Sequence, residues 1–114
     1  MEYLLLIYAE EKDWAGMSEA TQGVEMGKCI AFGKEFAERI KGSNSLQPTI
    51  TATTVRLRNG KQLTTDGPFA ETKEQLAGYY LIEAANLDEA IAMAAKNPVA
   101  PHGSIEVRPI RKLS

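Results

Sequence analysis

Two short apolar segments most constrain what this chain can fold into. Residues 3–8 and 79–82 are all aliphatic or aromatic, so each segment is apolar on both of its alternating faces. Successive side chains of a strand point to opposite faces of the sheet, so strands of this kind need apolar cover on both sides. The chain is therefore expected to build a sheet whose two faces both find apolar partners.

Periodicity and turn residues predict the other elements around these two strands. In chain order we predict a strand at 3–8, a helix from Ser18 to about 41, a hairpin around Asn59-Gly60, a strand at 78–84, a helix from about 86 to 98 and a strand at 104–110. Ser18 is the predicted N-cap of the first helix. Residues 42–45 are predicted to end it, because Gly42 suits a left-handed C-terminal position.

Two registers are open to the hairpin at Asn59-Gly60. A two-residue type I′ turn places Leu63 opposite Arg56, whereas a three-residue loop places Leu63 opposite Val55. A slip of one residue sends every side chain to the other face. Matching of the apolar faces therefore favours the three-residue loop.

This order of elements is the β-α-β-β-α-β plan of a ferredoxin-like α+β fold, with an antiparallel sheet and two helices on one face. The hairpin elaborates its middle, and residues 1–114 form a single domain of ordinary size. Two helices cover only one face of such a sheet, and a bare apolar face usually marks an interface. We therefore predict a homodimer whose sheets pack face to face about a two-fold axis.

The stretch from Asp66 to Leu76 reads Asp-Gly-Pro-Phe-Ala-Glu-Thr-Lys-Glu-Gln-Leu and runs into the strand at 78–84. It resembles the signature of the DGPF family, a branch of the YCII-related proteins. The similarity continues at residues 3–8 and 105–109, so it covers nearly the whole chain. The resemblance implies a dimeric α+β barrel but no agreed reaction. It also implies a genetic neighbourhood, because genes of this family often stand beside those of extracytoplasmic-function sigma factors.

The signature segment supplies the first candidate site residues. Asp66-Gly67-Pro68 is first of all a turn, but the polar loop 69–75 is longer than the connection needs, and such loops on rigid scaffolds often carry function. Asp66 is thus either a turn residue or an acid–base or ligand-binding group. Lys73 and Glu74 are either a solvated charge pair or ligand-binding residues, with Lys73 as an anchor for an anion.

The last strand supplies two more candidates, Glu106 and Arg108. They alternate with Ile105 and Val107, so one face of the strand is apolar and the other charged. If the apolar face lies under the helices, both charged residues point toward the second sheet. They then form either an interface salt bridge or a ligand-binding pair in which Arg108 grips an acidic ligand through two hydrogen bonds.

His102 is the single histidine of the chain and the side chain expected to titrate near neutrality. Relatives in the wider YCII group are thought to use a His–Asp pair with the histidine near the first helix, but residues 25–41 contain no histidine. Asp66 and His102 are therefore a catalytic hypothesis from other positions. An exposed, inert histidine is the alternative.

Composition excludes several function classes. The net charge of −2 comes without a basic stripe, which argues against nucleic acid as a partner. Cys29 is alone and is expected in the core. One cysteine and one histidine cannot build a structural zinc site, and we predict no metal or cofactor. The apolar run at 3–8 is far shorter than the ~20 residues that cross a bilayer, and no secretory signal precedes it, so we expect a cytoplasmic protein with no membrane partner.

Two functions from different classes follow. The first is a small-molecule enzyme or binder whose cleft lies between the sheets of the dimer, with the 66–74 loop and Arg108 at its rim and acid–base chemistry on a small polar or anionic ligand. The second is a non-catalytic regulatory or interaction module linked to a sigma factor. Ligand screening separates them, because a tight ligand raises the melting temperature.

Overall fold

The computed structural model describes residues 1–113. Its elements are β1 (Glu2–Ala9), α1 (Glu11–Ala15), α2 (Glu19–Glu35), β2 (Ile40–Ser45), a short 3₁₀ turn η1 (Thr49–Thr51), β3 (Thr53–Arg58), β4 (Lys61–Asp66), β5 (Gln75–Glu83), α3 (Leu87–Ala95) and β6 (Ser104–Pro109). The α+β class and the antiparallel sheet are confirmed. No helix within residues 1–113 is long and apolar enough to cross a membrane.

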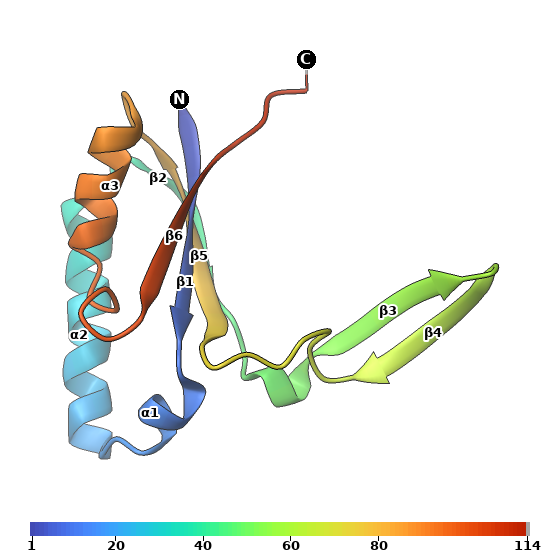
Figure 1. Cartoon of the computed structure of the whole chain (residues 1–114). Coiled ribbons are helices and arrows are strands. Elements are labelled where there is room, and N and C mark those ends of the chain that lie inside the picture. Colours follow the sequence, from blue (N-terminus) through green and yellow to red (C-terminus); the bar gives the residue numbers. More distant parts are fainter. Residues whose placement is uncertain (114) are drawn as a thin grey trace.

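Four strands form the main sheet in the order β2-β5-β1-β6, and every neighbouring pair is antiparallel. Helices α2 and α3 both lie on one face of it (Figure 1). The core forms between this face and the helices, with Leu5 and Ile82 fully buried against Met93 of α3 and Phe32 of α2 close by. The apolar strand at 3–8 is therefore central in the sheet, between β5 and β6.

The first helix is shorter than predicted, and its expected end is a strand. Ser18 is the N-cap, because its side chain accepts a hydrogen bond from the Thr21 amide at 3.1 Å, but α2 stops at Glu35. Residues 42–45, predicted to end the helix, belong to β2, where Ile40 pairs with Ile82. Gly, Ser and Asn are poor strand formers. The unpaired edge of β5 overrides that preference by giving their backbone groups partners.

The hairpin of β3 and β4 forms a separate two-stranded sheet. Asn59 and Gly60 have φ angles of 52° and 76°, which both residues of a type I′ turn require, and Arg56 lies opposite Leu63. The predicted three-residue loop is therefore wrong. The apolar side chains of the hairpin remain exposed, so burial has no power to select the register, and the turn residues select it instead.

The hairpin gives the molecule an open shape. It leaves the end of the sheet where β5 begins and extends on the side away from the helices, so that sheet and hairpin diverge like the arms of a V (Figure 1). The radius of gyration is 16.1 Å, against about 13 Å for a compact domain of this length. The inner side of the V is the sheet face that the helices leave uncovered.

Candidate functional site

The uncovered face of the main sheet, which we call the open face, carries a continuous apolar band. Residues paired directly across antiparallel strands share a face, and β1 places Leu4 opposite Leu81, Leu6 opposite Tyr79 and, beyond a bulge, Tyr8 opposite Leu76. All six side chains are only partly buried, and α2 and α3 lie on the other face (Figure 1). The apolar side chains that the sequence predicts on the face not covered by the helices are thus present.

Glu106 and Arg108 border this band along the β6 edge. Arg108 lies opposite Leu4 and Glu106 opposite Leu6, so both are on the open face, as alternation along the strand predicts. Arg108 Nε is 3.6 Å from Glu106 Oε2, and both side chains are well exposed. An exposed pair of this kind contributes about 0–1 kcal/mol, so Arg108 would lose little by exchanging Glu106 for a ligand carboxylate.

A polar pair borders the band on the opposite edge. Asn44 of β2 lies directly opposite Tyr79 of β5, and its Nδ2 donates to the Tyr79 hydroxyl oxygen at 2.8 Å. The phenol is thereby held at the β2 side of the open face while its own hydroxyl proton stays available for donation. The open face thus has an apolar floor with hydrogen-bonding groups on both sides, which is the general composition of a small-molecule site.

The loop after the hairpin is fixed by Gln75. Its Nε2 donates to the carbonyl oxygen of Thr72 at 2.6 Å and to that of Lys73 at 3.3 Å, while its Oε1 accepts from the Glu11 amide at 2.9 Å. One amide side chain therefore closes the loop on itself and ties it to the start of α1. Sequence reasoning placed Gln75 in a polar loop without a role.

Lys73 and Glu74 do not pair with each other in the described structure. Glu74 Oε1 accepts from the Ser104 hydroxyl at 2.7 Å, which links the loop to the first residue of β6. Lys73 Nζ lies 4.0 Å from Glu10 Oε1, and its side chain is 88% exposed. The ammonium group therefore remains accessible to an anion, whereas Glu74 has a structural partner. Their predicted roles as ligand-binding residues stay predictions.

The base of the hairpin is held by a second set of contacts that no local pattern indicated. The Glu11 carboxylate accepts from Thr49, at 2.7 Å from its amide nitrogen and 2.9 Å from its hydroxyl. The Gly67 amide donates to the Ala52 carbonyl at 2.7 Å, and Thr54 Oγ1 donates to the Gly67 carbonyl at 2.8 Å. Gly67 has a φ angle of 94°, as the turn interpretation of Asp66-Gly67-Pro68 predicts.

Asp66 and His102 lie in different parts of the molecule. Asp66 ends β4 at the hairpin base, with an exposed side chain. His102 is exposed in the turn between α3 and β6, where its amide donates to the Val99 carbonyl at 3.0 Å. Within residues 1–113 no hydrogen bond or ion pair joins the two side chains. A catalytic pair made by one chain therefore receives no support from the contacts.

Cys29 and Tyr80 belong to the helix-covered side rather than to a reactive site. The pKa of the Cys29 thiol is raised, first by burial and then by the nearby Glu25 carboxylate. The pKa of the Tyr80 hydroxyl is raised by burial and then by Cys29, and its ring packs 5.1 Å from that of Phe32. A thiol with a raised pKa is a poor nucleophile at neutral pH, in line with a packing role.

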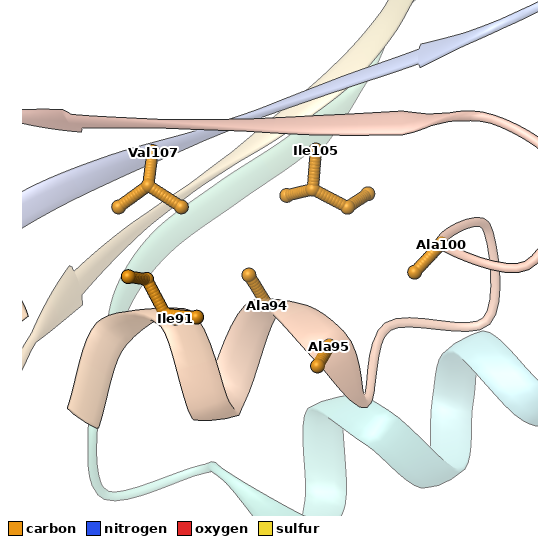
Figure 2. Close-up of a pocket in the computed structure, with 6 residues that line it drawn as sticks. All are labelled: Ile91, Ala94, Ala95, Ala100, Ile105 and Val107. Carbon is orange, nitrogen blue, oxygen red and sulfur yellow. The ribbon is translucent and has the colours of Figure 1, made fainter. Parts of the chain in front are cut away.

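A hollow of about 270 Å³ lies between α3 and β6, at the edge of the helix-covered face. Figure 2 shows its lining, which consists of six apolar residues: Ile91, Ala94, Ala95, Ala100, Ile105 and Val107. Binding sites need a few polar groups to orient a ligand, and this hollow offers no polar side chain. In the part of the chain that the structure describes, no three of the side chains that bind metals gather in one place.

Comparisons with known proteins agree on the family and the fold. The model of the YCII-related domain matches residues 1–114. Uncharacterized protein R00369 of Rhizobium meliloti (strain 1021) is 39% identical, over 96% of this chain and 92% of that protein. Among solved structures, 5-chloro-2-hydroxyhydroquinone dehydrochlorinase (TftG) of Burkholderia phenoliruptrix AC1100, in complex with 2,5-dihydroxybenzoquinone, is similar with a TM-score of 0.58 and 12% identity, over 97% of this chain and 94% of that one.

Proposed function

Because the chain belongs to the YCII-related domain family, we propose that it is a homodimeric enzyme or binder of a small polar or anionic molecule, with a cleft between the two open faces in a dimeric α+β barrel. The observation that carries the proposal is the apolar band of β1 and β5, with Glu106 and Arg108 beside it. A face of this kind on a small protein marks an interface, and charged groups at its border would line the resulting cleft. We also propose that the protein is located in the cytoplasm.

The ligand class comes from the open face and from one structural relative. An apolar floor bordered by a tyrosine hydroxyl and an arginine suits a flat molecule with polar substituents. TftG, which shares the fold, is a dehydrochlorinase whose structure was solved in complex with 2,5-dihydroxybenzoquinone. At 12% identity this likeness does not carry over a reaction, but it makes small hydroxylated rings the first compounds to screen.

In this proposal Arg108 and Lys73 bind the anionic group of the ligand. Glu106 holds Arg108 in place, and Glu74 holds the loop of Lys73 against Ser104. Arg108 has the fork geometry for two hydrogen bonds to a carboxylate, and Lys73 is the one cation of the signature segment 66–76. Asp66 and His102 are proposed as separate acid–base candidates rather than as a pair, because no contact joins them in one chain.

Two measurements test the proposal. Sedimentation at micromolar protein should give a dimer, and a screen of hydroxylated rings, aromatic acids and phosphate should raise the melting temperature for at least one class. Arg108→Ala should remove that shift while the dimer remains, with Glu35→Ala as the control because Glu35 lies on α2 and pairs with Lys96. A stable monomer, or a shift that persists in Arg108→Ala, would exclude the cleft as proposed.

A second function is favoured by the exposed apolar side chains of the hairpin and of the following loop. Leu57 and Phe69 are 68% and 80% exposed, which suits a protein partner. In this alternative the protein is a non-catalytic interaction module, and an extracytoplasmic-function sigma factor is the partner to test. Co-purification with such a factor, together with no thermal shift across the ligand screen, would favour this function.

A further inference from the structure

The β3–β4 hairpin lacks the contacts that ordinarily stabilise an element of its size. A two-stranded hairpin is at best marginally stable by itself in water, and the residues of β4 are all exposed. Val55 is 60% exposed, Leu57 68% and Leu63 47%. The hairpin therefore presents apolar area that nothing else in residues 1–113 covers.

The charges of the hairpin also require a partner. The register places Arg56 opposite Leu63 and Arg58 opposite Lys61. Three basic side chains therefore share one face with Leu63, whereas Val55 and Leu57 lie on the other face. Arg58 and Lys61 face each other directly, and like charges in that position destabilise a hairpin. An acidic surface would relieve this repulsion.

A second copy of the chain provides such a surface. The hairpin carries three basic residues and only Asp66 as an acid, whereas the whole chain has a net charge of −2, so the rest of the molecule is the more acidic part. Glu2, Glu83 and Glu106 lie on the open face by their pairing with β1 and β5. Charge complementarity thus favours contact between the hairpin and the sheet of a copy.

The base of the hairpin is closed by one backbone bond and is tied to α1 by a carboxylate. Glu11 holds Thr49 through two hydrogen bonds to its carboxylate, and the Gly67 amide is bonded to the Ala52 carbonyl. Hydrogen bonds to a charged group are the stronger kind. The hairpin therefore keeps the direction that Figure 1 shows, away from the helices and beside its own open face.

The hairpin is long enough to cross the sheet of a second copy. Its strands have six residues each, which corresponds to roughly 20 Å at 3.3 Å per residue. Four strands spaced about 4.8 Å apart make a sheet roughly 15–19 Å wide. A hairpin of this length can therefore reach across one end of the open face of a second copy, while the rest of that face stays free for the contact between the two sheets.

We propose that the β3–β4 hairpin of each protomer docks on the open face of a second copy, and that its basic face, formed by Arg56, Arg58 and Lys61, completes the cleft of that copy as a site for an anionic small molecule. The inference depends on the proposed dimer and adds that each cleft is incomplete without a segment of the other chain. Two-fold symmetry makes the exchange reciprocal.

Cross-linking between chains of different mass tests the docking. The variant Cys29→Ser/Leu63→Cys, labelled with a benzophenone at position 63 because Leu63 lies opposite Arg56 on the basic face, is prepared in ¹⁴N and ¹⁵N forms, mixed in urea, refolded and irradiated. We expect products that join a light and a heavy chain, with the second attachment in β1, β5 or β6. The matched control carries the label at Asp88→Cys, in the first turn of α3, and should give no such product.

Each outcome of this experiment is decisive. Attachment within one chain, attachment to α2 or α3 of the other chain, or no attachment would contradict the docking. If sedimentation nevertheless shows a dimer, the proposed function survives and only the hairpin exchange fails. A monomer would exclude both. Arg58→Glu/Lys61→Glu in the labelled protein should reduce the two-chain product about tenfold, because attraction is replaced by repulsion.

Mixed dimers test whether the basic face serves the other chain. The probe is anilinonaphthalene sulfonate, an anion with an apolar ring system, and one variant removes the hairpin charges (Arg56→Ser/Arg58→Ser/Lys61→Ser) while the other is Arg108→Ala. Each variant alone should lose most of the bound fluorescence. A random equal mixture should regain about a quarter of the sites, because half of the dimers are mixed and each has one intact cleft. No recovery, or no binding by the unmodified dimer, would overturn the site.

Discussion

The main sheet and the hairpin use the same antiparallel pairing but are stabilised by different forces. In the sheet, Leu5 and Ile82 are completely buried, and β1 has a partner strand on each side. In the hairpin each strand has one partner and no residue is buried. Backbone hydrogen bonds contribute little net stability by themselves, so the sheet is stabilised by its core. The hairpin has its turn and its cross-strand pairing and, in our proposal, the surface of a second copy.

The largest expected difference between the two regions concerns the loss of stability when one leucine side chain is removed from each. Leu5→Ala leaves a cavity in the core and should lower the free energy of unfolding by about 2–5 kcal/mol. Leu57→Ala, the same change in the hairpin, removes little buried area within one chain. At protein concentrations too low for the proposed dimer to form, it should lower the free energy of unfolding by less than about 0.5 kcal/mol. Urea denaturation of both variants at low and high protein concentration measures the difference. Equal losses at low concentration would mean that the hairpin already belongs to the core.

Glycine substitutions give the next contrast. A Cβ at Gly103 would lie 2.3 Å from the Tyr8 carbonyl oxygen, so Gly103→Ala should cost about 1–3 kcal/mol by overpacking against the sheet. Gly60→Ala meets no neighbouring atom but imposes a side chain on a φ angle of 76°, which should cost about 1 kcal/mol, confined to the hairpin. Thermal unfolding together with amide exchange of β3 and β4 distinguishes a global from a local loss.

Glu11→Gln tests the connection between the two regions. It keeps the shape of the side chain but removes the charge that strengthens both contacts to Thr49, and a charge-assisted bond contributes about 1.5–3 kcal/mol. We expect faster exchange of the β3 and β4 amides with a nearly unchanged melting temperature. Glu19→Gln, in the first turn of α2, is the control. A fall in melting temperature as large as that of Leu5→Ala would contradict a local role.

The smallest effect concerns the far end of the open face. The pKa of Glu83 is lowered, chiefly because its carboxylate accepts a hydrogen bond from the Met1 ammonium group. A depressed carboxyl pKa adds stability above the ordinary value of 4.5, and this stability is lost as the pH falls through the lower folded value. The pair is exposed, so the slope should be slight. The drop in melting temperature from pH 6 to pH 3 should be slightly smaller in Glu83→Gln than in the unmodified protein. Equal drops in the two proteins would mean that the pair of Met1 and Glu83 does not contribute to stability.

The same contrast explains how far the fold could be predicted. Alternation and apolar composition identified β1, β5 and β6, because in those strands burial determines which face each side chain takes. Residues 42–45 were misassigned because β2 forms by pairing with β5, which is distant in the sequence. The local residue preferences of this segment do not favour a strand. The hairpin register was wrong for the related reason that apolar matching was applied where nothing is buried.

The candidate site follows the same rule. The faces of Glu106 and Arg108 could be predicted, since a strand alternates with a period of two. The roles of Glu11, Thr49 and Gln75 could not, because Glu11 and Thr49 are 38 positions apart and Glu11 and Gln75 are 64 apart. Asp66 and His102 were paired on chemistry alone, and the chain places them on the hairpin and on the α3–β6 turn.

The bond between the Gly67 amide and the Ala52 carbonyl makes the chain enter and leave the hairpin at a single point. Segments with adjacent ends tolerate insertion and deletion well, since a change in their length moves nothing outside them. The projecting segment is thus modular in an evolutionary sense. Related chains can lengthen, shorten or recharge it without altering a strand of the sheet, and selection for a new ligand or companion can proceed there at little risk to folding.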